Sequence, residues 1–101
     1  MKMSVRISID HNEIVSFCQR HHIRQLAFFG SVLRDDFRPD SDVDVLVEFE
    51  PGFRLGLFEL IRMQQEFSHI IGREADFRTP EDLGRHMRER VVAESEVQYA
   101  A

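Results

Sequence analysis

The sequence predicts an α/β domain in which a small, mixed β-sheet is flanked by helices. Segments with the apolar periodicity of strands and of helices alternate along the chain, as they do in α/β proteins. The composition, with 43% hydrophobic and 31% charged residues, is typical of a globular protein. At 101 residues the chain is long enough for a modest core, and residues 1–101 are expected to form a single domain.

The first part of the chain is expected to form a helix, a strand and a short helical turn. Asp10 suits the N-cap of a helix that ends near His22, because apolar residues follow it at helical spacing. A strand at Arg24–Phe29 then breaks at Gly30-Ser31. One helical turn is expected after this break, at Val32–Asp35.

The central part contains the clearest strand and the longest helix. Over Asp42–Glu50 the residue type alternates with a period of two, which is a strand signal. Apolar residues then recur at helical spacing over about Leu55–Ile71, and Gly72 is a suitable C-terminal stop.

The last part is expected to add a third strand and a final helix. Glu74–Arg78 is a short run with an apolar centre, the best candidate for the strand. Thr79-Pro80, followed by two acidic residues, predicts a helix start, and the helix should reach about Glu94 or Glu96. Val97–Ala101 is expected to be a tail.

Composition also narrows the possible functions. The single cysteine, Cys18, cannot form an internal disulfide, so a reducing, cytoplasmic setting is expected. No apolar run is long enough to span a membrane, and no secretory leader is recognised, so we expect no membrane partner. The net charge of −5 argues against direct nucleic-acid binding through phosphate contacts.

Two acidic residues interrupt an otherwise apolar strand. Asp42 and Asp44 are spaced so that both side chains lie on one strand face, about 6.6 Å apart. At an effective dielectric constant near 20, two such carboxylates repel each other by roughly 2 kcal/mol. A bound divalent cation would offset this repulsion, so the pair predicts a metal site.

Gly30-Ser31 is a second candidate for binding. A Gly-Ser pair at a strand-to-helix junction lets the backbone approach a ligand and presents N–H groups and a hydroxyl, which suits phosphate. When the dipeptide stands alone, an ordinary turn is the better explanation. Together with Asp42 and Asp44, it indicates a site for a metal-bound nucleoside triphosphate.

Asp76 lies within the apolar run of the expected third strand. If that strand lies beside Asp42–Glu50, the Asp76 carboxylate completes a cluster of three. Such a cluster can hold two Mg²⁺ ions about 3.5–4 Å apart. A strand-end carboxylate that faces water is the alternative interpretation.

Other polar groups have simpler explanations. Cys18 and His22 offer two ligands, which do not make a zinc site. Arg85, Arg88 and Arg90 are mixed with glutamates, as expected for a solvated helix face.

Taken together, these residues resemble a known signature. Gly30-Ser31, Arg34 and Ser41-Asp42-Val43-Asp44, running into a hydrophobic strand, are similar to the signature of the DNA polymerase beta-type nucleotidyltransferase superfamily. The whole length resembles its minimal nucleotidyltransferase (MNT) branch. Gly72–Phe77 followed by Thr79-Pro80 resembles that branch's segment with the third carboxylate. The resemblance covers about Ile23 to Glu94 and implies the nucleotidyltransferase fold.

The resemblance also implies roles for individual residues. Asp42 and Asp44 would ligate two Mg²⁺ ions, and Asp76 would ligate the catalytic ion and act as a base. Gly30-Ser31 would grip the triphosphate of ATP, the implied substrate.

Arg34 has two interpretations. It would neutralise phosphate charge, or it is a surface residue that pairs with Asp35 or Asp36. Asp35 stands where many relatives have glycine, and it adds negative charge near the expected phosphates.

Members of the MNT branch resemble one half of a two-gene system. The partner is a helical HEPN-domain protein, typically a ribonuclease toxin, and the MNT protein is the antitoxin. The resemblance implies that AMP is transferred from ATP to a tyrosine hydroxyl of this toxin within a hetero-oligomer. Two alternatives stay open: a catalytically inert antitoxin that binds the toxin stoichiometrically, and a nucleotidyltransferase that acts on a small molecule or an RNA end.

Overall fold

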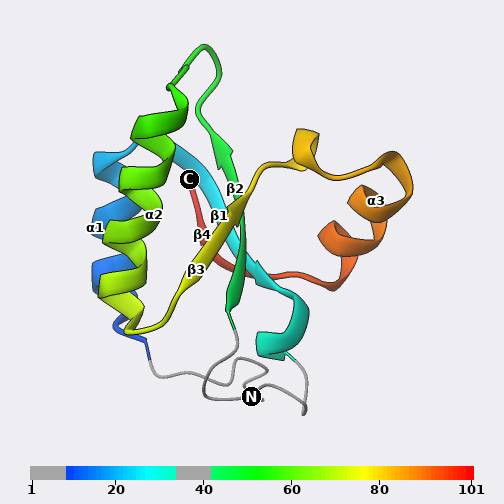
Figure 1. Ribbon diagram of the computed structural model, residues 1–101, viewed down its shortest axis with the longest axis horizontal. Helices are drawn as coiled ribbons and strands as arrows, with labels where there is room; N and C mark the ends of the chain where they lie inside the picture. Colours follow the sequence, from blue (N-terminus) through cyan, green and yellow to red (C-terminus); the bar gives the residue numbers. More distant parts are fainter. Residues whose placement is uncertain (1–8, 34–41) are drawn as a thin grey trace.

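Over residues 9–33 and 42–101, which a computed structural model describes, the chain forms a four-stranded mixed sheet (Figure 1). The strands are β1 (Ile23–Phe29), β2 (Val43–Phe49), β3 (Ala75–Arg78) and β4 (Glu96–Ala100), in the spatial order β3-β2-β1-β4. β1 is antiparallel to both β2 and β4, whereas β2 and β3 are parallel. The predicted small mixed sheet is confirmed.

Helices α1 (His11–Arg20) and α2 (Leu57–Ile71) cover one face of the sheet, and α3 (Arg85–Glu94) lies on the other side (Figure 1). The predicted helix signals at α1 and α2 are confirmed. The Asp10 carboxylate accepts a hydrogen bond from the Asn12 N–H at 3.0 Å, as an N-cap does. Gly72 ends α2 in the left-handed conformation, with φ of 71°.

The core lies between the sheet and the α1/α2 layer. Three phenylalanine rings from different elements meet there and are fully buried: Phe17 of α1, Phe28 of β1 and Phe67 of α2. The ring centroids of Phe17 and Phe67 are 5.1 Å apart, within the range of favourable aromatic pairs. Each fully buried side chain of this size contributes about 1.5–3 kcal/mol, so the aromatic cluster holds both helices on the sheet.

The prediction of one continuous helix from Thr79 is wrong, because only its first turn forms there. Thr79-Pro80 begins only a short 3₁₀ turn, η2 (Pro80–Asp82), and α3 begins separately at Arg85. The Asp82 carboxylate turns back to accept a hydrogen bond from the Thr79 N–H at 3.0 Å. Leu83 then has extended backbone angles, with ψ of 141°, which ends the turn.

The predicted tail at Val97–Ala101 is wrong, because this segment forms β4. It pairs with the edge of β1, with Leu26 opposite Tyr99, and the Ala101 N–H donates to the Arg24 carbonyl at 2.9 Å. The pairing satisfies backbone groups of β1 that would otherwise form an open edge. Five residues without strong alternation do not reveal this pairing from sequence alone.

The remaining boundaries differ from the predicted ones by one or two residues. The short turn η1 (Gly30–Leu33) begins at Gly30 instead of Val32, and residues 34–41 lie outside the described residues. In the part of the chain that the structure describes, no helix is long and apolar enough to cross a membrane.

A polar cluster joins the end of α1 to α2. Glu66 of α2 binds the Arg20 guanidinium at 2.7 Å, and its other oxygen lies 2.9 Å from Nε2 of His21. Partial burial raises the pKa of Glu66, but the hydrogen bonds from Arg20 and His21 outweigh it, so the pKa lies below its usual value.

We expect this cluster to make the fold sensitive to acid. Because the pKa of Glu66 is lower in the folded chain, its contribution is complete above the ordinary value of 4.5 and is lost as the pH falls through the folded-state pKa. Glu66→Gln should therefore be less stable than wild type at neutral pH, and the difference should vanish at acid pH. Urea unfolding from pH 7 downward measures it. Glu89→Gln, on the exposed face of α3, is the control, and a difference independent of pH would contradict the prediction.

The buried thiol gives a second test of the core. Cys18 is fully buried in α1, and burial raises its pKa to about 12. Since the thiolate is the reactive form, we expect Cys18 to resist iodoacetamide at pH 8 in the native protein and to react in urea. Mass spectrometry detects the adduct. If Cys18 reacted as fast in the native protein as in urea, the described burial of Cys18 in α1 would be wrong.

Candidate active site

A sharp corner at the end of β1 approaches the middle strand. Phe29, the last residue of β1, is the register partner of Asp44 on β2. Gly30 follows with φ of 77°, a conformation that favours glycine. A Cβ at Gly30 would collide with the Asp44 carboxylate and lie 3.2 Å from its Cγ. The missing side chain therefore lets the backbone corner pack directly against Asp44.

The parallel pairing of β2 and β3 brings two predicted site residues together. Asp44 and Asp76 are register partners, so their side chains share one face of the sheet. Their neighbours along both strands are buried in the core under α1 and α2, so both aspartates face away from that core. The second and third strands are thus adjacent in the sheet, which is the condition that the sequence analysis set for bringing Asp76 to the site.

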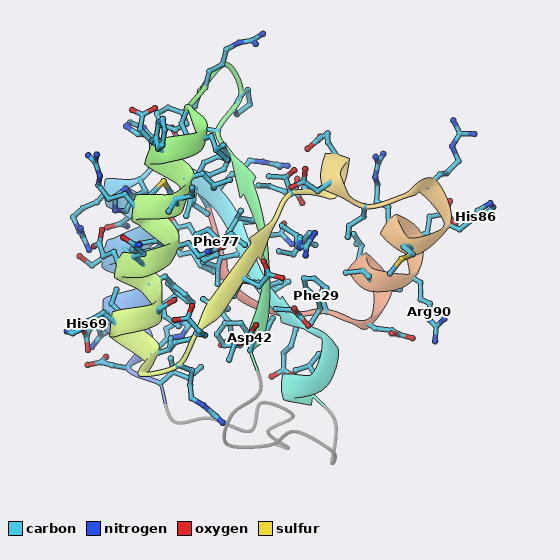
Figure 2. The ribbon with its side chains drawn as sticks, in the orientation of Figure 1. Phe29, Asp42, His69, Phe77, His86 and Arg90 are labelled. Atoms are coloured by element: carbon cyan, nitrogen blue, oxygen red, sulfur yellow. The ribbon has the colours of Figure 1, made fainter. Side chains whose placement is uncertain are left out.

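Asp42 lies just before β2 and is exposed. Figure 2 shows it at the same end of the sheet as Phe29, beside η1. Among the described residues, which include all three aspartates, no group of three or more His, Cys, Asp or Glu is placed to hold a metal ion. The structure thus brings Asp44 and Asp76 together, and convergence of the third carboxylate remains a prediction.

The Asp76 carboxylate already has a cationic partner. Arg78, two residues further along β3, donates to one Asp76 oxygen from Nη2 at 3.1 Å and from Nε at 3.3 Å. The sequence analysis did not single out Arg78, although a period of two along a strand would have placed it beside Asp76. A metal ion bound through that oxygen would compete with the guanidinium for it.

Two predicted residues cannot be placed in this site. Arg34 lies outside the described residues, and so does the side chain of Ser31, although its backbone is part of η1. Their expected contacts with phosphate remain predictions.

A cleft opens where the Gly30 corner faces α3. It has a volume of about 370 Å³, within the usual range of small-molecule sites. Phe29, Gly30 and Asp44 form the wall on the sheet side, and the wall on the α3 side is lined by Met87, Arg90, Val91 and Glu94. Sequence reasoning missed this second wall, because nothing local predicts where α3 packs.

The donor chemistry of the site fits magnesium. Carboxylate oxygens are the protein ligands that Mg²⁺ prefers, and Asp44 and Asp76 present them side by side. Zinc ligation by Cys18 and His22 is not supported, since Cys18 is buried in the core and His22 stacks on Phe53 with ring centroids 4.5 Å apart. The arrangement suits an oxygen-ligated cation next to the Gly30 corner.

Comparison with solved structures defines the class of this fold. A minimal nucleotidyltransferase of known structure is 33% identical, with a TM-score of 0.69 over 84% of this chain and 85% of that chain. The fold also matches a chain in the structure of a tri-AMPylated HEPN toxin of Shewanella oneidensis in complex with an MNT antitoxin. There the TM-score is 0.65 at 15% identity, over 90% of this chain and 70% of that one, a likeness of fold alone. The chain therefore has the nucleotidyltransferase fold, as predicted.

Sequence comparison defines the family. The sequence model of the nucleotidyltransferase domain matches residues 11–99. A protein of Methanocaldococcus jannaschii that bears the name protein adenylyltransferase is 29% identical over 83 residues, covering 82% of this chain and 87% of the relative. The protein adenylyltransferase MntA of Thermococcus cleftensis is 29% identical over 76 residues, 75% of each chain. This chain belongs to the nucleotidyltransferase domain family.

The corner offers a test with a matched control. Gly30→Ala and Gly52→Ala both place a side chain at positive φ, which costs about 1–2 kcal/mol of stability. Only at Gly30 does the new Cβ also meet Asp44, because nothing lies within 4 Å of a Cβ at Gly52. We expect both variants to lose stability in urea unfolding, Gly30→Ala at least as much as Gly52→Ala, but weaker Mn²⁺ binding, measured by electron paramagnetic resonance, for Gly30→Ala alone. Equal Mn²⁺ affinity in the two variants would show that the Gly30 corner does not influence metal binding by the carboxylates.

Proposed function

We propose that this chain is a Mg²⁺-dependent protein adenylyltransferase that transfers AMP from ATP to a tyrosine hydroxyl of a HEPN-domain ribonuclease toxin, and that it thereby serves as the antitoxin. The observation that carries the proposal is the register that sets Asp44 next to Asp76 beside the Gly30 corner. Two findings support the proposal. Related proteins bear the name protein adenylyltransferase, and a chain with this fold occurs in the complex of an AMPylated HEPN toxin with an MNT antitoxin.

The proposed reaction is a single displacement at the α-phosphorus of ATP. The tyrosine oxygen attacks in line with the leaving group, and its new bond to phosphorus forms as the bond to the bridging oxygen of the β-phosphate breaks. Pyrophosphate leaves with that oxygen, and the tyrosine proton passes to the Asp76 carboxylate. In this role Asp76 exchanges its hydrogen bonds with Arg78 for contacts with the reactants.

The site residues would also bind the metal ions and the triphosphate. Asp42, Asp44 and Asp76 would hold the magnesium ions, which when bound neutralise phosphate charge and orient the attacking oxygen. The backbone of the Gly30-Ser31 corner would donate N–H groups to the triphosphate, since the absent Cβ leaves room for close approach. Arg34 would add a positive charge.

The decisive experiment is AMP transfer to the purified toxin. With labelled ATP and Mg²⁺, Asp44→Asn should lose transfer by about 100-fold or more, since even outer-shell partners of metal ligands contribute roughly 10- to 100-fold. Glu48→Gln, on the same strand and paired with Arg24 at 2.6 Å, removes the same charge outside the site and should retain transfer. Tryptic mass spectrometry identifies the modified residue. Equal transfer by wild type and Asp44→Asn would overturn the catalytic assignment.

The same proteins separate the proposal from its alternatives. If the chain acts by catalysis, toxin activity is abolished at substoichiometric amounts of the chain and only with ATP. Neutralisation by Asp44→Asn at equimolar amounts without ATP would instead identify an inert antitoxin. Label found on a small molecule or an RNA end, with none on the toxin, would identify a different acceptor.

A further inference from the structure

We infer that α3 forms the second wall of the nucleotide site, with Met87 in contact with the nucleoside and Arg90 as a cation for the phosphates of ATP. The inference rests on the proposed function, because it names residues that would bind the substrate of that reaction. It assigns a binding role to a helix whose arginines are expected, from the sequence, to be solvated.

The position of the cleft supports a nucleotide as its occupant. One wall contains Gly30 and Asp44, the corner expected to hold triphosphate and the strand expected to hold magnesium. A triphosphate at that corner leaves its nucleoside in the adjoining space, toward either the cleft or open solvent. The cleft adds Phe29 and Met87 as apolar surfaces, and the faces of a nucleobase pack well against such surfaces.

The way α3 packs leaves this wall available. Of the residues of α3, only Val91 is buried, and Met87 is 59% exposed although it lines the cleft. An exposed methionine on a lightly packed helix has an unbranched side chain that adapts its rotamer to a ligand. The helix is held at its start by Arg88, which donates to the Pro80 carbonyl at 2.7 Å, so the wall stays in place.

The three arginines of α3 therefore have different surroundings. Arg88 is tied to η2, Arg85 is exposed away from the cleft, and Arg90 lines the cleft. The Arg90 side chain is 77% exposed and extends from α3 into solvent (Figure 2). Its contact with Glu94 is 3.5 Å long and exposed, and such pairs contribute little. Arg90 can thus exchange this weak partner for a phosphate.

Charge explains why such a cation matters in this chain. The protein carries a formal net charge of −5, and Asp44 and Asp76 lie side by side next to the corner. ATP brings further negative charge into this environment. Among the described residues that line the cleft, Arg90 is the one cationic side chain. Guanidinium groups bind phosphate oxygens through two parallel hydrogen bonds, which suits this role.

The test compares Arg90→Gln with Arg85→Gln, which removes the same charge from the same helix outside the cleft. Binding of a fluorescent ATP analogue in Ca²⁺, and its displacement by ATP or adenosine, measures affinity without turnover. We expect Arg90→Gln to weaken ATP about tenfold and leave adenosine unchanged, as loss of a charge-assisted hydrogen bond would. Arg85→Gln should stay within about twofold for both. Met87→Gln should weaken both ligands.

Each outcome decides the inference. It is overturned if Arg90→Gln binds ATP as wild type does, if Arg85→Gln weakens ATP equally, or if Met87→Gln changes neither ligand. Circular dichroism of each variant establishes that α3 remains folded. A failure of the proposed function is distinguishable, because a chain that transfers no AMP would still show ATP affinity that depends on Arg90.

Discussion

The position of β2 between two neighbours is the constraint on which the candidate site depends. β2 is antiparallel to β1 and parallel to β3, so Asp44 has Phe29 as its register partner on one side and Asp76 on the other. A slip of one residue in either pairing would turn the aspartates into the core and valines into solvent. The hydrophobic effect that buries the valines thereby also holds the carboxylates on the opposite face.

The two faces of the sheet have different roles. Under α1 and α2, the aromatic side chains of Phe17, Phe28 and Phe67 pack closely within the main hydrophobic core, whose burial stabilises the fold. On the other face α3 buries only Val91 and leaves a cleft beside Asp44. Because stability comes from the first face, the second can remain open and acidic without unfolding the domain.

Much of the fold was predictable because its signals are local. Alternation in β2, the Asp10 cap and the Gly72 stop each depend on a few adjacent residues, and the structure confirms all three. The errors arise where a distant segment decides the outcome. Val97–Ala101 becomes a strand only because the edge of β1 is available, and Thr79-Pro80 starts a turn that Leu83 ends.

The sequence by itself determined the residue types of the site: aspartates spaced on strands, a glycine at a strand end, and the family to which they belong. Only the tertiary structure decided which of these side chains are neighbours. It paired Asp44 with Asp76, set Arg78 on the Asp76 carboxylate and placed Arg90 beside the cleft. The physical reason is that strand register and helix packing are set by burial over the whole core, which no short stretch of sequence contains.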